Sequence, residues 1–286
     1  MSKWMVQMCD FCKKHADKLL RANRWYLHPE CYSEDIAMTH DRIKVYNQIM
    51  GYLGEYYFSF TNHVLRFQKN TRIPFLRRIL REYARRQAPN LHAGQIVSLE
   101  DAIKIIDLSD KHVLLPCACR SHSGGYEEFT CLNFGVVKDL TEKAAPDMQI
   151  EEVTRSEAKK LLEEWDQRGY YHQSLWAKQP YILCICNCDS RSCVPRKQRL
   201  VFDMPYALTK GHDVAICDHE LCDGCLGRPA CSGQCPFHAI SYDHYKKRIS
   251  VDQKICFGCG VCRVVCDRKA LSLTPREQVP LIKNEW

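Results

Sequence analysis

Eight cysteines near the C-terminal end of the chain fall into two runs of almost the same spacing. The runs are Cys222-x2-Cys225-x5-Cys231-x3-Cys235 and Cys256-x2-Cys259-x2-Cys262-x3-Cys266. Three thiolates on a tight loop can hold three corners of an iron–sulfur cube, and the fourth cysteine, which enters a helix, serves the other cube. The spacing therefore predicts two [4Fe–4S] clusters. The first takes Cys222, Cys225, Cys231 and Cys266, and the second takes Cys256, Cys259, Cys262 and Cys235.

An internal repeat supports this assignment. Asp218 stands four residues before Cys222, as Asp252 does before Cys256, and an alanine follows the last cysteine of each run at the same distance. Each half should then read as a loop, a cluster turn, a short helix and a strand, as a duplication would produce. A pair of zinc knuckles is the alternative, because Cys-x2-Cys pairs also suit zinc. Eight ligands in an interlocked pattern favour the clusters.

Residues 212–275 resemble the two-cluster bacterial ferredoxin domain on the strength of these motifs. Two features depart from its pattern. The insertion 227–229 widens the first loop, and Asp267 follows the last cysteine where a proline is usual. Neither departure removes a ligand.

Composition indicates a globular, cysteine-rich chain. The chain has 286 residues, of which 45% are apolar, and 19 cysteines. No apolar run is long enough to span a membrane, and no signal-peptide core opens the sequence, so we expect a cytoplasmic protein. So many cysteines in a non-secreted chain indicate metal and cluster ligation in an anaerobic or strongly reducing cell. The net charge of +7 falls towards neutrality once clusters bind to thiolates, so it is weak evidence for nucleic-acid binding.

The first 40 residues carry a second ligand pattern. Its members are Cys9, Cys12, His15, His28 and Cys31. Three cysteines and either histidine would complete a tetrahedral site, which suits zinc, although iron–sulfur clusters occasionally accept histidine. Ordinary reduced cysteines and surface histidines are the other interpretation.

Residues 41–95 read as helical and basic. Apolar residues recur at helical spacing over 41–69, and a second amphipathic helix follows Pro74. Between Arg66 and Arg86 there are eight basic residues and one acid, Glu82. Such a helix can dock a redox partner, lie on a membrane surface or touch phosphates, or it can be a solvated face over an apolar stripe.

Residues 96–210 predict a small domain with helices and strands. Ser98 and Thr154 each open a helix, and Gly169 closes the second one. Val113–Pro116 and 181–188 read as buried strands that end in Cys-x-Cys runs, so each can present two sulfurs from one side. If the strands pair, the sulfurs converge into a metal pocket, with Cys184 left in the core; buried, inert cysteines are the alternative. The predicted pocket comprises Cys117, Cys119, Cys131, Cys186, Cys188 and Cys193.

Two polar residues beside this pocket can affect its reduction potential. Arg120 and His122 lie beside it in sequence, where they can set its potential, donate a proton or simply face solvent. Cys217, the one cysteine outside every proposed group, is expected to be buried and structural.

The order of these motifs resembles a family of 4Fe-4S ferredoxin-type proteins of anaerobes. The likeness rests on Pro116-Cys-x-Cys-Arg120, Cys131-Leu-x-Phe-Gly135, Ile185-Cys-Asn-Cys188 and the C-terminal cysteine runs. It implies a multicluster electron-transfer protein of anaerobic archaea or bacteria. Relatives often carry further cysteines after Cys-Asn-Cys, but residues 189–191 of this chain are Asp, Ser and Arg. The ligand set of the central site differs from theirs to that extent.

We therefore expect an α+β protein in four parts: a metal knuckle (1–40), a basic helical segment (41–95), a cysteine-rich α/β domain with a third cluster (96–210) and a dicluster domain with its tail (211–286). The expected function is low-potential electron relay to or from a partner oxidoreductase or complex, with no catalytic residue assigned and no nucleotide or flavin motif. One alternative is a reductase with substrate chemistry near Arg120 and His122. Another is a regulatory protein that binds nucleic acid.

Overall fold

The computed structural model describes residues 24–38, 93–121, 128–176, 181–201 and 207–283, with residues 75, 78, 79, 82 and 126. Most of the predicted basic helices, over 41–69 and 75–86, therefore lie outside the described residues, as do Cys9, Cys12, His15 and His122. None of the helices in the described ranges is long and apolar enough to cross a membrane.

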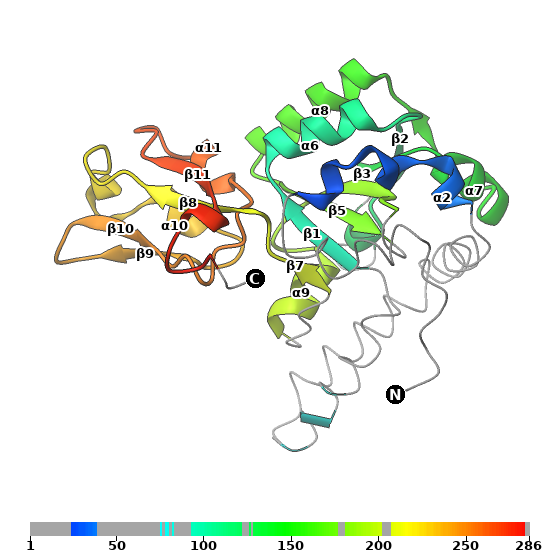
Figure 1. The fold of residues 1–286 in the computed structure, drawn as a ribbon. Helices are drawn as coiled ribbons and strands as arrows, with labels where there is room; N and C mark the ends of the chain where they lie inside the picture. Colours follow the sequence, from blue (N-terminus) through cyan, green and yellow to red (C-terminus); the bar gives the residue numbers. More distant parts are fainter. Residues whose placement is uncertain are drawn as a thin grey trace.

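A seven-stranded sheet forms the larger body (Figure 1). Its strand order is β4-β2-β3-β6-β5-β1-β7, and all neighbours are antiparallel except β1 and β7. The strands are β1 (Ala93–Val97), β2 (Val113–Pro116), β3 (Phe129–Asn133), β4 (Glu151–Glu152), β5 (Tyr171–Trp176), β6 (Cys184–Cys188) and β7 (Leu208–Thr209).

The two predicted helices of this body begin where their capping residues indicate. The Ser98 side chain accepts from the Asp101 N–H at the start of α6 (Leu99–Leu108). Thr154 and Glu157 form the complete capping box at the start of α8 (Arg155–Gln167), which ends before Gly169 at φ +80°. Both helices lie on the same side of the sheet in Figure 1. Other helical segments that the structure describes in this body are η1 (Trp25–Leu27), η2 (Pro29–Tyr32), α2 (Glu34–Ala37), α7 (Val137–Ala144), α9 (Val194–Val201) and a turn at 118–121.

The two faces of the sheet belong to different cores. Leu132 and Ile185 pack with α6 and α8, together with Trp25 and Tyr26 of the N-terminal segment. The opposite face packs with the C-terminal unit, and it is there that the strand cysteines point. Strand alternation thus separates an aliphatic and aromatic core from a cysteine-rich one.

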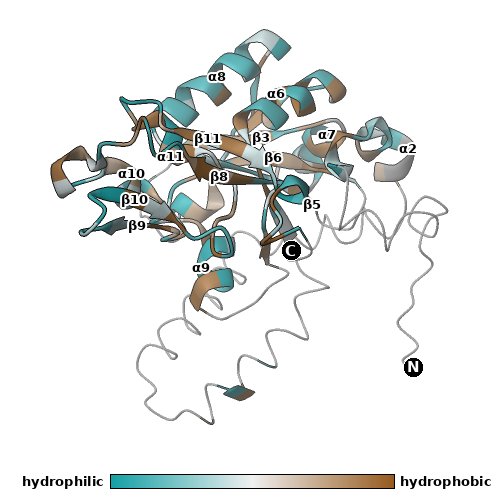
Figure 2. Ribbon diagram, turned by 60° about the vertical axis from the view of Figure 1, so that its left-hand side comes forward, coloured by the Kyte–Doolittle hydropathy of each residue, from teal (hydrophilic) through white to brown (hydrophobic). Residues whose placement is uncertain are grey.

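The C-terminal unit consists of two small antiparallel sheets and two short helices (Figure 1). Strand β11 pairs with β8, and β10 pairs with β9. Figure 2 shows β8 and β11 largely brown, whereas α8 on the outside of the larger body is largely teal. The elements are β8 (Asp213–Cys217), η5 (Gly224–Gly227), α10 (Ala230–Gln234), β9 (Ile240–Asp243), β10 (Arg248–Val251), α11 (Val261–Val264), β11 (Leu271–Pro275) and η6 (Arg276–Gln278).

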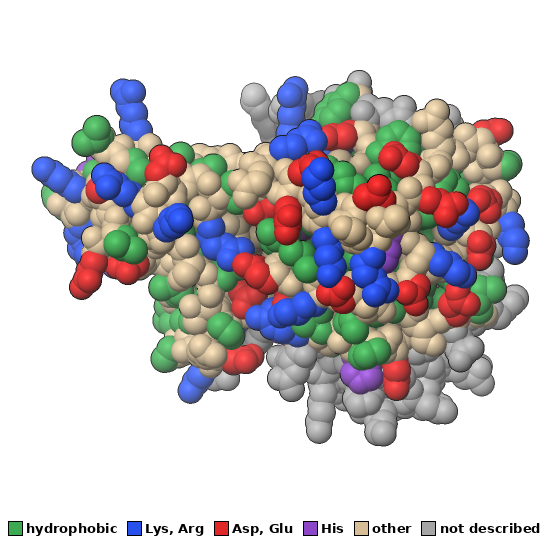
Figure 3. Space-filling model, turned by 90° about the horizontal axis from the view of Figure 1, so that it is seen from above, with side chains coloured by type: hydrophobic (Ala, Val, Ile, Leu, Met, Phe, Trp, Pro, Cys, Tyr) green, Lys and Arg blue, Asp and Glu red, His purple; other side chains and the backbone are tan. Residues whose placement is uncertain are grey.

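Each half of the unit runs through a turn, a short helix and a strand, as the sequence repeat predicts: α10 precedes β9, and α11 precedes β11. The mixture of helices with several sheets is consistent with an α+β protein. On the face seen in Figure 3, acidic and basic side chains are interspersed over the larger body. Ion pairs such as Lys159 with Asp107, at 2.6 Å, belong to this mixed surface.

Candidate iron–sulfur sites

The two cysteine turns of the C-terminal unit repeat one another in their backbone hydrogen bonds. Cys222 N–H donates to the Asp218 carbonyl at 3.1 Å, and Cys256 N–H donates to the Asp252 carbonyl at 2.9 Å. Each aspartate side chain also accepts from the backbone two residues on. The aspartate therefore folds the turn that begins each cysteine run, which explains why it recurs at this spacing.

The two halves are joined by a reciprocal pair of hydrogen bonds. Asp218 N–H donates to the Ala270 carbonyl, and Asp252 N–H donates to the Ala239 carbonyl, each at 2.8 Å. Each alanine lies four residues after the last cysteine of its own run. The first turn of one half is therefore held beside the last cysteine of the other half, as the predicted exchange of ligands requires.

Those last cysteines also receive matching hydrogen bonds. Ala239 N–H donates to Cys235 Sγ at 3.3 Å, and Ala270 N–H donates to Cys266 Sγ at 3.4 Å. Such bonds favour the charged thiolate over the thiol. They also affect the reduction potential of a cluster bound to that sulfur.

Four cysteines line a single pocket, and we call them the inner thiol site: Cys235, Cys256, Cys259 and Cys262. The other lining residues are Ala215, Pro236, Phe237, Ala239, Ile240, Phe257 and Gly260, so none of the described residues around the pocket carries a charge. Cys256 Sγ accepts from the Ala215 and Gly258 N–H groups at 3.4 Å. Burial raises the pKa of Cys262 to about 12 and that of Cys259 well above its ordinary value.

This pocket fits an iron–sulfur cube. Apolar walls favour the neutral thiol, so deprotonation of these cysteines costs free energy. Iron binds the deprotonated thiolate, and that binding offsets the cost. Four sulfurs that face one apolar pocket supply the four ligands that a cube requires, and no charged side chain lines the pocket.

The other four cysteines of the unit form the outer thiol site: Cys222, Cys225, Cys231 and Cys266. Burial and the neighbouring thiols of Cys266, Cys225 and Cys222 raise the pKa of Cys231 to about 11, which places the four together. Cys225 is exposed, and Cys222 and Cys266 are half-buried. The outer site thus reaches the surface, while each cysteine of the inner site is at most 9% exposed.

Cys217 lies beside the outer site. It ends β8 and is half-buried, so the expectation that it is buried was wrong, and its structural role stays a prediction. Burial and the nearby Cys222 raise its pKa to about 12. The strand runs outward at this point, and its last residue emerges from the core next to the cysteine turn.

A third group of cysteines gathers on the larger sheet, and we call it the central thiol site: Cys117, Cys119, Cys131, Cys186, Cys188 and Cys193. The alternation of β6 places Cys186 and Cys188 on the face opposite Ile185. The strands before the two Cys-x-Cys runs do not pair directly, because β3 lies between β2 and β6. That intervening strand contributes Cys131, which stands opposite Cys186 with 3.5 Å between the two sulfurs.

The remaining members reach the same place from two turns. Cys117 and Cys119 follow β2, and hydrogen bonds with Cys119 and then Cys131 lower the pKa of Cys117 well below its ordinary value. Cys193 precedes α9. Gln173 of β5 donates through Nε2 to Cys188 Sγ at 2.9 Å and to Cys193 Sγ at 3.6 Å. The structure thus brings together all six predicted cysteines.

Gln173 was not predicted from the sequence, because nothing local marks a glutamine on β5 as a neighbour of two cysteines. Cys184 is buried, as expected, at 6% exposed, but it lies in the same cysteine-rich core as Cys186, with 3.9 Å between the two sulfurs.

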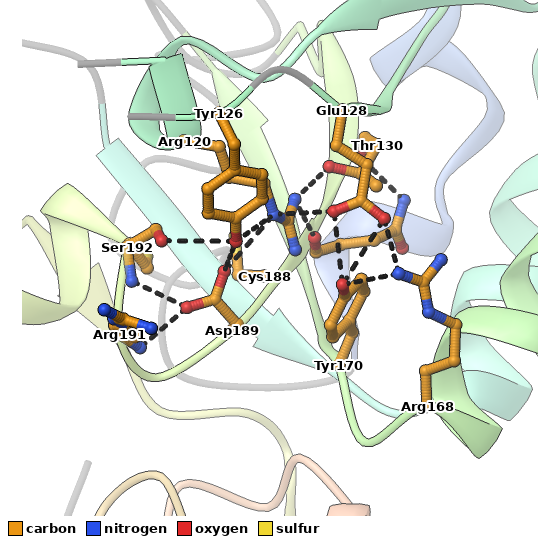
Figure 4. Close-up of polar contacts among 12 residues, drawn as sticks. Arg120, Tyr126, Glu128, Thr130, Arg168, Tyr170, Cys188, Asp189, Arg191 and Ser192 are labelled. Atoms are coloured by element: carbon orange, nitrogen blue, oxygen red, sulfur yellow. Dashed lines mark hydrogen bonds and ion pairs between the residues drawn. The ribbon is translucent and has the colours of Figure 1, made fainter. Parts of the chain in front are cut away.

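Arg120 forms the polar wall of the central site (Figure 4). It is 1% exposed, and its Nε lies 3.0 Å from Glu128 Oε2 and 3.3 Å from Asp189 Oδ2. Its Nη1 donates to the Thr130 hydroxyl and, at 3.1 Å, to the Asn187 carbonyl. The guanidinium carbon also lies 4.5 Å from the centre of the Tyr170 ring.

An aromatic stack connects the inner site to the central one. The rings of Phe237 and Phe257, which both line the inner pocket, are stacked with centroids 4.0 Å apart. The Phe237 ring also lies against that of Tyr171, with 5.5 Å between the ring centroids. Tyr171 also lies beside Cys193, whose charge contributes to the raised pKa of the tyrosine after the larger effect of burial.

The N-terminal knuckle is described only in part. Cys31 is buried in the core with Trp25 and Tyr26, and its thiol lies 3.4 Å from the Trp25 carbonyl. His28 is exposed. The other predicted ligands lie outside the described residues, so this site stays a prediction. Within the described ranges, no group of three His, Cys, Asp or Glu residues could hold a single metal ion.

Comparison with known proteins supports a broad class. The chain is 38% identical over 65 residues to a protein of Methanosarcina acetivorans described as a subunit of an ion-translocating oxidoreductase complex. The match covers 22% of this chain, and the chain spans about a fifth of the length of that relative, 22%. No family model and no solved structure matches the chain.

The cysteine sites and this partial likeness support the class of iron–sulfur electron-transfer proteins, and nothing narrower.

Proposed function

We propose that the chain is a multicluster iron–sulfur protein that relays single electrons at low potential to or from a partner oxidoreductase or a larger redox complex. The observation that carries the proposal is the interlock of the C-terminal unit. Two halves with the same hydrogen bonds each hold the other's last cysteine, and four cysteines line one uncharged pocket. We further propose the four-part division into 1–40, 41–95, 96–210 and 211–286.

The proposed ligands are the inner and outer thiol sites for two [4Fe–4S] clusters and the central thiol site for a third cluster. When bound, such clusters take up and release one electron at a time, at a potential set by cluster type, hydrogen bonds to the sulfurs and solvent exposure. The protein supplies thiolates, N–H groups that donate to sulfur, and apolar walls that exclude water.

Burial assigns different tasks to the three sites. The outer site contains the exposed Cys225 and is the one we assign to exchange with a partner protein. The inner site is buried and adjoins the outer one, because Cys262 lies on α11 and Cys231 lies on α10, which contacts it. Phe237 packs between the inner pocket and Tyr171 of the central site. The proposed order is therefore outer, inner, central.

A complex is the partner that fits best. The relative from Methanosarcina acetivorans is described as part of an oxidoreductase complex, and an exposed cluster site is useful only where another redox centre can approach it. We propose a cytoplasmic location, with docking to a membrane surface as an option. Zinc at the N-terminal knuckle is an additional proposal.

Metal analysis tests this function directly. The full chain is purified anaerobically, iron, sulfide and zinc are measured, and the dithionite-reduced form is studied by EPR. We expect about twelve iron atoms and three spin systems, as three cubes require. About eight iron atoms and two spin systems would remove the central cluster. An iron content near zero would overturn the proposal as a whole.

A second candidate function has one specific observation in its favour. The central site gathers six thiols, whereas a cube needs four, and Arg120 lies at its edge. In an iron–sulfur reductase, the thiols beyond the four that hold a cube would be free to contact a substrate at this site. A central EPR signal that changes when a small molecule is added would favour the reductase, and a signal indifferent to a panel of small oxidants favours the relay.

A further inference from the structure

Arg120 is a buried cation, and it is not a ligand in any of the three thiol sites. It is among the largest fully buried side chains, at 1% exposed. A buried charge is costly unless it is paired and hydrogen-bonded. Its two carboxylate partners, Glu128 and Asp189, have side chains that are 21% and 19% exposed, so they sit on the solvent side of the guanidinium. Figure 4 shows the guanidinium between these two groups.

One nitrogen of this guanidinium is left over. Nε and Nη1 have acceptors, but the buried Nη2 finds none in the part of the chain that the structure describes. A buried donor without an acceptor loses its hydrogen bonds to water without replacement, and this loss is larger when the donor is charged. Another acceptor is therefore expected when the protein carries its cofactors.

The thiols of the central site are the neighbours that can supply it. Cys117 and Arg120 belong to the same turn, in which Arg120 N–H donates to the Cys117 carbonyl at 3.0 Å. Cys188 follows Asn187, whose carbonyl accepts from Nη1. These two hydrogen bonds hold the arginine against the turn that carries Cys117 and against the strand end that carries Cys188.

Arg276 provides a contrast elsewhere in the chain. It is also buried, at 0% exposed, but its guanidinium donates to the backbone carbonyls of Gly211, Gln253 and Cys256. Its donors hold loops together. Arg120 instead has one buried donor, Nη2, for which the described residues offer no acceptor.

We propose that Arg120 sets the reduction potential of the central thiol site, with its buried cation beside the bound cluster and its Nη2 group donating to a sulfur there. This inference rests on the proposed function, because it requires a cluster at that site. One-electron reduction adds a negative charge to the cluster, and a cation in a low-dielectric environment stabilises the reduced state. Arg120 therefore raises the potential, while Glu128 and Asp189 lower it.

The chain offers a matched control. Arg168 pairs with the same Glu128 at 2.6 Å and lies over the same Tyr170 ring at 4.7 Å, but its side chain is 53% exposed. Solvent screens its charge, so Arg168→Gln should leave the central potential nearly unchanged. A comparison of the two arginine variants separates the effect of a buried charge from that of the shared network.

The experiment is an EPR-monitored redox titration of the full chain, purified anaerobically. Cys131→Ser identifies the central signal as the one it abolishes. At the wild-type midpoint, we expect Arg120→Gln to be about tenfold less reduced, which for one electron is a lowering of ~59 mV. Glu128→Gln should shift the midpoint the opposite way. Arg120→Lys keeps the charge without the planar fork and should restore part of the potential.

Each result bears on the inference. An unchanged midpoint in Arg120→Gln, or an equal shift in Arg168→Gln, would overturn it while leaving the third cluster in place. A wild-type chain with about eight iron atoms and no central signal would instead mean that the proposed third cluster is wrong. If Arg120→Gln does not take up the cluster, the opposite shifts expected of Arg120→Lys and Glu128→Gln decide the question.

Discussion

The guanidinium of Arg263, on α11 of the C-terminal unit, holds the carboxylate of Glu100, on α6 of the larger body, through two hydrogen bonds of 2.7 and 3.1 Å. A second bridge runs nearby, where Arg24 pairs with Asp213 at 2.8 Å and also with Asp101. The two bodies are therefore joined by oriented ion pairs as well as by the packing of Phe237. This junction fixes the inner thiol site relative to the central one.

The Glu100 contact predicts a dependence on pH. Burial raises the pKa of Glu100, but the hydrogen bond from Arg263, a backbone hydrogen bond, the charge of Arg263 and a hydrogen bond from Ser98 together lower it from 4.5 to about 2. A depressed carboxylate pKa stabilises the folded state above pH 4.5, and that contribution is lost as the pH falls towards 2. Because the Glu100 side chain is 54% exposed, the contribution is small, below about 1 kcal/mol.

Removal of the arginine tests this relationship. In Arg263→Gln we expect the pKa of Glu100 to return to its ordinary value or above, as followed by NMR of a carbon-labelled carboxyl group. Arg268→Gln is the control, since Arg268 pairs with the exposed Asp223. An unchanged titration of Glu100 in Arg263→Gln would contradict the assignment.

Phe237 should matter for transfer between sites. Phe237→Leu removes the ring stacked on Phe257 at 4.0 Å and loosens the contact with Tyr171. We expect slower electron transfer between the inner and central sites at unchanged midpoint potentials, measured by flash reduction. Phe134→Leu is the matched control, because Phe134 is as buried but packs with α6 and α8. Both variants should lose about 1 kcal/mol of stability; equal transfer rates in the two would contradict the role of Phe237.

Single cysteine variants should show which cluster each cysteine of the C-terminal unit binds. Cys256→Ser removes a member of the inner site, and Cys231→Ser removes a member of the outer site. Each variant should lose up to about four iron atoms and one EPR signal, and the lost signals should differ. Cys217→Ser should keep both signals. Loss of the same signal in both ligand variants would refute the proposed division.

His212 predicts a second dependence on pH. Burial, followed by the charges of Arg24 and Arg276, lowers its pKa from 6.5 to about 4. A depressed histidine pKa means that the neutral form is favoured on folding, so stability is complete above pH 6.5 and falls as the pH drops towards 4. The loss is about 1.4 kcal/mol per pH unit in that window.

Denaturant unfolding under anaerobic conditions at pH 7.5 and 5.5 measures this effect. His212→Phe keeps a ring beside Tyr26, whose own ring lies 5.4 Å from that of His212, and it removes the titrating group. We expect the variant to lose about 1.4 kcal/mol less than the wild type between the two pH values. An equal loss in both proteins would show that other groups are responsible.

Local signals in the sequence predicted local structure well. The capping residues Ser98 and Thr154 begin helices, and Val113–Pro116 is a strand with the predicted bounds. The aspartate and alanine positions of the repeat recur in matching hydrogen bonds. These features depend on residues a few positions apart, so a single sequence contains them.

Long-range order was less accessible. No local pattern indicates that β3 should lie between β2 and β6, since that choice depends on how whole strands pack. For the same reason Gln173 and the aromatic contact of Tyr171 with Phe237 were not anticipated. The six central cysteines were expected to converge through direct pairing of the two strands, and the structure gathers them without that pairing. Strand alternation sets the face of Cys131, Cys186 and Cys188, whereas the other three come from turns.

The reciprocal bonds from Asp218 to Ala270 and from Asp252 to Ala239 have a consequence for biosynthesis. Under the proposed ligand sets, the first cube cannot be closed until Cys266 has left the ribosome, although its other ligands emerge some forty residues earlier. The second cube likewise waits for three cysteines of the later half. Neither cube can therefore be completed before the later cysteine run has emerged, and a product that ends before Cys256 would leave both the inner and the outer thiol site without a full ligand set.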